Sequence, residues 1–263
     1  MGKSAMIKVQ VINKEGTIIA EAAGTKEVNL PVSRTYEEGD RVVFLVDETP
    51  AFYVFQADDA LGEALVYVTG EVSYEIPFGE KKVCYSPKIF SGESHLITAR
   101  KAREWEYESY RNLAVNVMDQ HGDTNCYPHA TANVETRGES VFAARNAIDG
   151  VTSNHSHGYW PYGSWGINRN PEATMRVDFG REVTTDRIEI YTRADFPHDA
   201  WWTKATVRFS DDTTMVCDLV KTDEGQEFTF PPKKVRWVQL EELSKADDPS
   251  PFPALSQLKV YGK

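Results

Sequence analysis

The chain has 263 residues, of which 41% are hydrophobic and 26% charged, values that are ordinary for a globular protein and exclude general disorder. A formal net charge of −11 argues against nucleic acid as a partner, because an acidic surface repels phosphates. No run approaches the ~18 apolar residues of a membrane span. No apolar signal segment follows Met1 either, so we expect a cytoplasmic protein, or an extracellular one from which a leader has been removed.

Short strands fill the first 97 residues. Their runs are rich in β-branched and aromatic residues, and they recur at a spacing of roughly 8–12 residues, which is typical of an antiparallel sandwich or barrel. They cover residues 7–11, 17–20, 41–46, 51–55, 65–68 and 72–76. We therefore predict an N-terminal β-sandwich domain over residues 1–97, whose role the sequence does not indicate.

One helix is predicted between the two halves of the chain. Thr98 can cap its first turn, and residues 99–111 contain neither Gly nor Pro. We expect a helix over residues 98–112 within a linker that covers residues 98–127.

The remaining residues, 128–263, again predict strands, now with long polar and aromatic connections. The expected strands cover residues 175–179, 188–190, 206–209, 214–219, 227–230, 235–240 and 258–261. The predicted fold class is therefore all-β, with two sandwich domains joined by one helix.

Aromatic and histidine residues concentrate in two loops of this second half. Residues 155–202 hold four of the six Trp and three of the six His. A sugar offers a C–H face that packs on an indole ring, and hydroxyls that pair with Arg, Asp and His. We therefore predict a ligand-binding set of His157, Trp160, Arg193, Asp195, His198, Asp199 and Trp201. Trp165 and Trp202 adjoin strands, and we expect them in the core.

Other chemistry remains open for the same loops. His155 and His157 could bind a transition metal if they lay on a strand, but Gly158 favours a loop. Asp195 and Asp199 could be a glycosidase pair, although carboxylates beside an Arg are more often structural. Cys84, Cys126 and Cys217 are far apart in the sequence, and their odd number favours buried free thiols over a disulfide framework.

An ordered series of short motifs gives the second half a family resemblance. It runs from Asn146-Ala147-Ile148-Asp149-Gly150 through Met175-Arg176-Val177-Asp178-Phe179-Gly180 to Leu255-Ser256-Gln257-Leu258-Lys259-Val260-Tyr261-Gly262. Over residues 128–263 this series resembles the discoidin domain, also called the coagulation factor V/VIII C-type domain, and the family 32 carbohydrate-binding modules. The resemblance implies a galactose-binding-like jelly roll that binds carbohydrate, or in animals phospholipid and protein, without catalysis.

The resemblance also implies a structural calcium ion near the Asp149 turn. The corresponding ligands here are Asp149, Val151, Asn154 and Gln257. Asn154 replaces the usual Thr and Gln257 the usual Glu, and the loss of a carboxylate weakens a site for a hard cation.

The function predicted from the sequence is non-catalytic glycan binding by a lectin-like module, through loops at one end of the C-terminal domain. Two alternatives remain: a hydrolase or sugar-modifying enzyme with its site between the domains, and a protein-binding scaffold. An open aromatic platform would favour sugar binding, and a closed pocket with converging acids would favour an enzyme.

Overall fold

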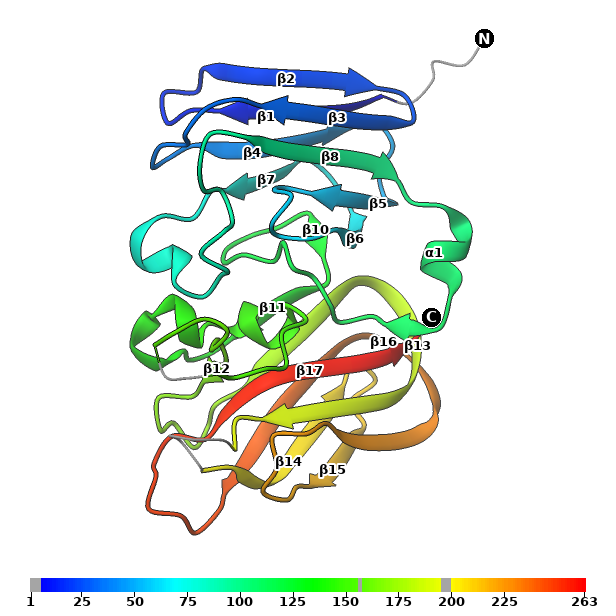
Figure 1. Cartoon of the computed structure of the whole chain (residues 1–263). Coiled ribbons are helices and arrows are strands. Elements are labelled where there is room, and N and C mark those ends of the chain that lie inside the picture. Colours follow the sequence, from blue (N-terminus) through cyan, green and yellow to red (C-terminus); the bar gives the residue numbers. More distant parts are fainter. Residues whose placement is uncertain (1–5, 156–157, 195–199) are drawn as a thin grey trace.

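A computed structural model describes residues 6–155, 158–194 and 200–263. The chain forms two β-sandwiches, one above the other in Figure 1, and strands make up most of its regular structure. The predicted all-β fold is confirmed. Among the described residues, no helix has the length and apolar character needed to cross a bilayer.

The first sandwich consists of two antiparallel sheets, with strand orders β2-β1-β4-β7 and β10-β6-β5-β8-β3. Its inner faces are apolar because alternate residues of each strand point inward; in β3, for example, every second residue is buried. The strands are Ile7–Ile12 (β1), Ile18–Gly24 (β2), Glu27–Val32 (β3), Arg41–Val46 (β4), Ala51–Gln56 (β5), Ala64–Val68 (β6), Val72–Glu75 (β7), His95–Lys101 (β8) and Cys126–Tyr127 (β10).

The core of this sandwich lies between the two sheets. Phe44 of β4 and Phe55 of β5 stack with ring centroids 4.3 Å apart, and both are fully buried. The rings therefore join one sheet to the other, and burial of two such side chains stabilises the fold by about 3–6 kcal/mol.

The segment between the sandwiches differs from its prediction. Residues 98–101 belong to β8, in which Ile97 and Ala99 are buried with the period of two that a strand requires. Helix α1 covers only Glu104–Glu108, and the Glu106 carboxylate accepts a hydrogen bond from the Arg103 N–H at its start. The predicted helix over 98–112 is therefore wrong, whereas the domain limits at 97 and 128 stay predictions.

The linker adds strands to both sandwiches. β10 pairs with β6 of the first, and Arg111–Asn112 (β9) pairs with β17 of the second. Leu113 continues this pairing by donating its N–H to the Val260 carbonyl at 2.6 Å. The linker is thus built into both sheets.

The second sandwich is one continuous sheet that curls around its own core. Its strand order is β12-β17-β13-β16-β14-β15, and β11 pairs with β13. Its strands after the linker are His129–Ala132 (β11), Trp165–Gly166 (β12), Met175–Thr192 (β13), Trp202–Phe209 (β14), Thr214–Asp218 (β15), Gln226–Lys245 (β16) and Ala254–Gly262 (β17). Trp165 and Trp202 are fully buried with centroids 6.3 Å apart, which confirms that both belong to the core.

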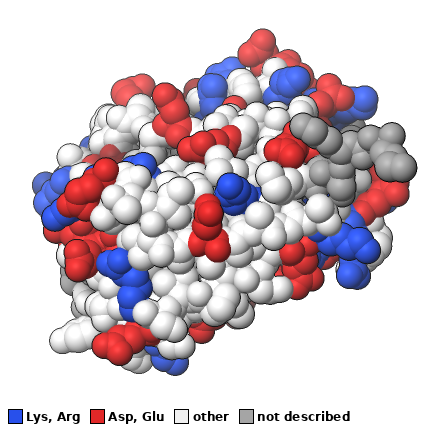
Figure 2. All heavy atoms as spheres, turned by 90° about the horizontal axis from the view of Figure 1, so that it is seen from above, with Lys and Arg blue, Asp and Glu red and all other residues white. Residues whose placement is uncertain are grey.

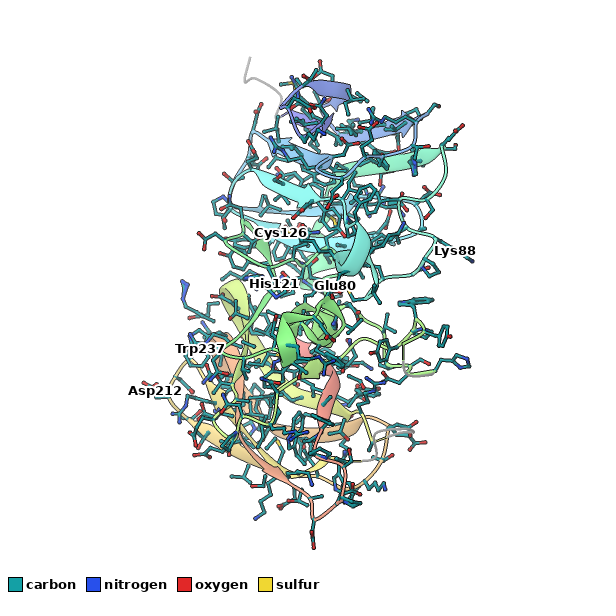
Figure 3. All side chains as sticks on the ribbon, turned by 90° about the vertical axis from the view of Figure 1, so that its left-hand side faces the viewer. Glu80, Lys88, His121, Cys126, Asp212 and Trp237 are labelled. Carbon is teal, nitrogen blue, oxygen red and sulfur yellow. The ribbon has the colours of Figure 1, made fainter. Side chains whose placement is uncertain are left out.

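Polar contacts join the two sandwiches. In Figure 3, Glu80 and His121 lie at the level where they meet. The Ser140 N–H and hydroxyl donate to Glu80, each at 2.6 Å, and the Gln120 amide donates to the Glu75 carbonyl at 2.8 Å. The junction is therefore held by hydrogen bonds between specific residues.

Candidate functional site

Arg193 has a fixed place at one end of the second sandwich. It directly follows β13, and its N–H donates to the Ala254 carbonyl at the start of β17, at 2.8 Å. Its guanidinium lies over the Tyr162 ring, 4.7 Å from the centroid, and only 2% of the residue is exposed. Strand pairing and ring stacking therefore position this side chain without help from a ligand.

A cleft of about 150 Å³ opens beside Arg193. Three segments form its walls: Thr136, Arg137 and Phe142 after β11, residues 166–169 from the end of β12, and residues 252–254 at the start of β17. Loops that converge at one end of a rigid sandwich are where such folds place their binding sites. Of the described residues that the sequence predicted for ligand binding, only Arg193 lines this cleft.

Three arginine–aromatic pairs surround this cleft. Arg137 lies over Phe142 at 5.5 Å and Arg169 over Phe252 at 4.5 Å, and Arg193 over Tyr162 is the third pair. A planar guanidinium on a ring keeps its N–H groups available at its edge, so each ring orients a donor. No Asp or Glu of the described ranges lines the cleft.

The backbone beside the cleft is strained. Arg137, Asn168 and Arg169 have φ values of 54°, 49° and 60°, in the left-handed region that side chains other than those of Gly seldom adopt. Such conformations cost about 1–3 kcal/mol each and cluster at functional sites. The strain therefore supports a functional role for the two segments that carry these residues.

The structure separates Trp160 from Arg193. Trp160 is 40% exposed and lines a second groove, between the two sandwiches, with Leu61 and Tyr85 of the first. Trp201 is half-buried, and the Lys221 ammonium lies 5.2 Å from its ring centroid. His157, Asp195, His198 and Asp199 lie outside the described residues, as does the second member of the His155–His157 pair.

Sequence reasoning missed Arg137, Phe142, Arg169 and Phe252. They come from three connections that are far apart in the sequence, and an isolated Arg or Phe in a loop carries no distinguishing pattern. Only the convergence of the three loops shows that they share a cleft.

The predicted calcium turn is closed by hydrogen bonds. The Gly150 N–H, which can only donate, faces the Gln257 Oε1 at 3.0 Å and so fixes which way this amide points. Its Nε2 then donates to the Asn146 carbonyl at 2.6 Å and to the Asp149 Oδ1 at 2.8 Å. An amide nitrogen therefore joins two oxygens that a cation would otherwise share.

The other two expected ligands are held through their nitrogen atoms. The Val151 N–H donates to the Asp149 Oδ1 at 2.8 Å, and the Asn154 Nδ2 donates to the Ser256 hydroxyl at 2.8 Å. The Arg145 guanidinium lies 3.9 Å from the second Asp149 oxygen and supplies a positive charge. The Gln257 amide and the Arg145 charge do not fit a calcium ion as they are oriented, whereas the Asn154 Oδ1 is buried without a hydrogen-bond partner among the described residues; calcium binding itself stays an untested prediction.

Burial governs the charge of this turn. Burial raises the pKa of Asp149 to about 6, although Arg145 and the hydrogen bonds from Val151 and Gln257 oppose the shift. Arg145 itself is buried, and its Nε donates to the Asp119 carbonyl of the linker at 2.9 Å. Its guanidinium also stacks on Tyr85 of the first sandwich, 4.4 Å from the centroid. Arg145 therefore connects the turn with both the linker and the first sandwich.

The groove between the sandwiches was the predicted place for an enzyme site. A hollow of about 130 Å³ there is lined by Cys84, Tyr85, His121 and Arg145, among others. In the described part of the chain, no group of three or more His, Cys, Asp or Glu side chains is placed to hold a metal ion. Cys84 is buried, and burial raises its pKa, which opposes a nucleophilic role.

Comparisons with known proteins address the second sandwich. Two similar solved structures are a chitosan-binding module of a chitosanase/glucanase from Paenibacillus sp. IK-5 (21% identity, 58% of this chain and 99% of that one, TM-score 0.38) and a family 32 carbohydrate-binding module from C. perfringens with galactose (18%, 50% and 91%, 0.39). A third is the lectin domain of lectinolysin with Lewis B antigen (18%, 58% and 97%, 0.43). A comparison with curated proteins gave no match.

The family match covers much of the same region. Residues 129–251 match the F5/8 type C domain, from the first residue of β11 to just before the cleft residue Phe252. The match contains Arg193, Arg137 and Arg169. Residues 129–251 are therefore similar to an F5/8 type C, or discoidin, domain, the family that the order of the motifs predicted.

Proposed function

We propose that this protein binds glycan, without catalysis, at the cleft beside Arg193. The observation that carries the proposal is the convergence of three loops of an F5/8 type C domain on one cleft with arginine–aromatic pairs. Guanidinium groups donate paired hydrogen bonds to the vicinal oxygens of a sugar, and the Asn168 amide adds a donor and an acceptor.

The absence of converging acids favours binding over hydrolysis. A glycosidase needs two carboxyl groups on either side of the scissile bond, and the described lining of the cleft has none. A small, open site of this kind should bind one or two sugar residues with a Kd on the order of micromolar to millimolar.

Trp160 and Trp201 remain proposed contacts. Trp160 is exposed in a groove of its own, so a longer glycan would have to reach beyond the cleft to touch it. Trp201 follows Arg193 by eight positions and is half-buried, with the Lys221 ammonium 5.2 Å from its ring centroid.

The test is a glycan array on the full chain, followed by calorimetry with the best glycan. We expect Arg169→Met to weaken binding at least tenfold with an unchanged melting temperature, because the Arg169 side chain is exposed. The matched control is Arg236→Met, an exposed arginine of β16 that does not line the cleft. Trp160→Ala and Trp201→Ala report whether either ring takes part.

Two results would overturn this assignment. Full binding by Arg169→Met together with loss in Trp160→Ala would place the site in the groove between the sandwiches. Mass spectrometry of the incubated glycan gives the second: a cleaved or modified product would show an enzyme rather than a binding protein.

A further inference from the structure

We infer that the cleft selects glycans that carry an anionic group, a carboxylate or a sulfate. This inference rests on the proposed function and adds the chemical class of the ligand to it. It comes from how the charges and rings of the cleft are arranged.

Charge is distributed differently in the cleft than elsewhere on the molecule. The whole chain has 40 acidic and 29 basic residues, and Figure 2 shows the two kinds interspersed over the end of the molecule that carries β2. The described lining of the cleft, by contrast, contains three arginines and no carboxylate. A lining whose described charged groups are arginines, within an acidic protein, attracts a ligand of the opposite charge.

The three arginines differ in how far they are already neutralised. Arg137 is paired with Glu139 through two contacts, one of them from Nη2 to Oε2 at 2.7 Å. Arg169 is exposed, and no ion pair joins it to a carboxylate of the described chain. Arg193 lines the cleft but is buried, with its guanidinium over the Tyr162 ring. Arg169 is therefore the group best placed to meet a charged ligand from solvent.

The aromatic rings favour the same ligand. A neutral sugar usually packs its C–H face on an open ring, but in this cleft a guanidinium already covers one face of Phe142 and of Phe252. These rings therefore orient the arginines. A guanidinium held flat presents two parallel N–H groups, which match the two oxygens of a carboxylate or sulfate.

The strained backbone holds this arrangement in place. Asn168 and Arg169 both have positive φ values, so the turn that presents the Arg169 guanidinium is fixed before a ligand arrives. A donor that is already oriented loses little conformational entropy on binding, which increases its contribution to affinity.

The experiment compares three matched ligands by calorimetry: lactose, sialyllactose with its carboxylate, and sulfated lactose. We expect the unmodified protein to bind at least one anionic ligand about tenfold or more tightly than lactose, because a charge-assisted pair adds about that factor. The preference should decrease as salt is added, and comparison of the two anionic arms shows which group the cleft takes.

Arg169→Met should abolish the preference, so that the three ligands bind that variant with affinities within about threefold of one another, and Arg236→Met should keep the preference. Equal affinity for all three ligands, or a preference that survives in Arg169→Met, would overturn the inference and leave glycan binding standing. If no glycan binds on the array or in solution, the proposed function fails together with the inference. Sialyllactose and sulfated lactose that bind to the Arg236→Met protein but not to the unmodified protein would also contradict the inference.

Discussion

Replacing Gln257 by Glu should make the stability of this protein depend on calcium. The amide of Gln257 donates from Nε2 to the Asn146 carbonyl and to the Asp149 carboxylate; Gln257 and Asn146 are buried, and the Asp149 side chain is 9% exposed. A carboxylate at the same position has no proton to donate at neutral pH, so these two oxygens would face further oxygens. A cation would then be needed to join them.

The size of the effect follows from these contacts. Two buried acceptors that lose their donors cost about 1–3 kcal/mol each, so Gln257→Glu should lower the free energy of unfolding by about 2–6 kcal/mol. Calcium at about ten times its Kd would return about 1.4 kcal/mol. For a chain of this size that corresponds to about 3–6 °C in melting temperature.

The assay is a thermal melt in EDTA and in calcium chloride, at about pH 8 so that both carboxyl groups are ionised, since burial raises the pKa of Asp149 to about 6. We expect the unmodified protein to change by less than about 1 °C, because the amide and Arg145 already close the turn. Gln226→Glu, at the start of β16, is the control for an added charge. An unmodified protein that melts several degrees higher in calcium, or a Gln257→Glu variant indifferent to it, would refute this reasoning.

Three further predictions concern the junction and the thiols. Arg145→Met should lower the free energy of unfolding by about 3–5 kcal/mol in urea, because it leaves the Asp149 carboxylate buried without its cation; a change below about 1 kcal/mol would show that Arg145 is not needed there. The hydrogen bond to Glu135 raises the pKa of His121 above 6.5, although burial opposes it, so this pair stabilises the fold below that pH and the effect is lost as the pH rises through the raised value. Urea unfolding between about pH 6 and 8 should show the unmodified protein losing about 0.2–1 kcal/mol relative to His121→Asn, and equal losses would contradict the pairing. The three cysteines are buried with raised pKa values, so a thiol reagent should label the native protein far more slowly than the unfolded one; rapid native labelling would contradict this burial.

The strands could be predicted from the sequence because burial follows their alternation. Val72 and Tyr74 are buried on the inner face of β7 while Ser73 and Glu75 between and after them are exposed, as the period of two indicates. The helix was mispredicted for a related reason. The run after Thr98 has no Gly or Pro, but the alternation of Ile97 and Ala99 identifies the strand that forms there. The absence of Gly and Pro wrongly suggested a helix, whereas the alternation of apolar residues would have indicated a strand.

The candidate site could be predicted only in part. Arg193 was identified because it adjoins a strand end in a loop rich in aromatic residues, and the structure places it beside a cleft. Arg169 and Phe252 were missed, because the sequence separates them by more than 80 positions and their contact depends on how two loops fold. Trp160 was grouped with Arg193 because both stand in aromatic loops that the family resemblance brings to one end of the sandwich, yet it lines a groove against the other sandwich. A shared composition does not show which loops converge.

The strands of the linker limit how this protein can be divided or recombined. A fragment that begins at residue 128 would lack β9, and the edge of β17 that pairs with Arg111 and Asn112 would be left open. It would also lose Leu113, which is buried in the core of the second sandwich. Open strand edges pair with other chains, so such a fragment should aggregate, whereas one that begins before Arg111 keeps its edge covered. The second sandwich is therefore transferable to another protein only together with the segment that precedes it.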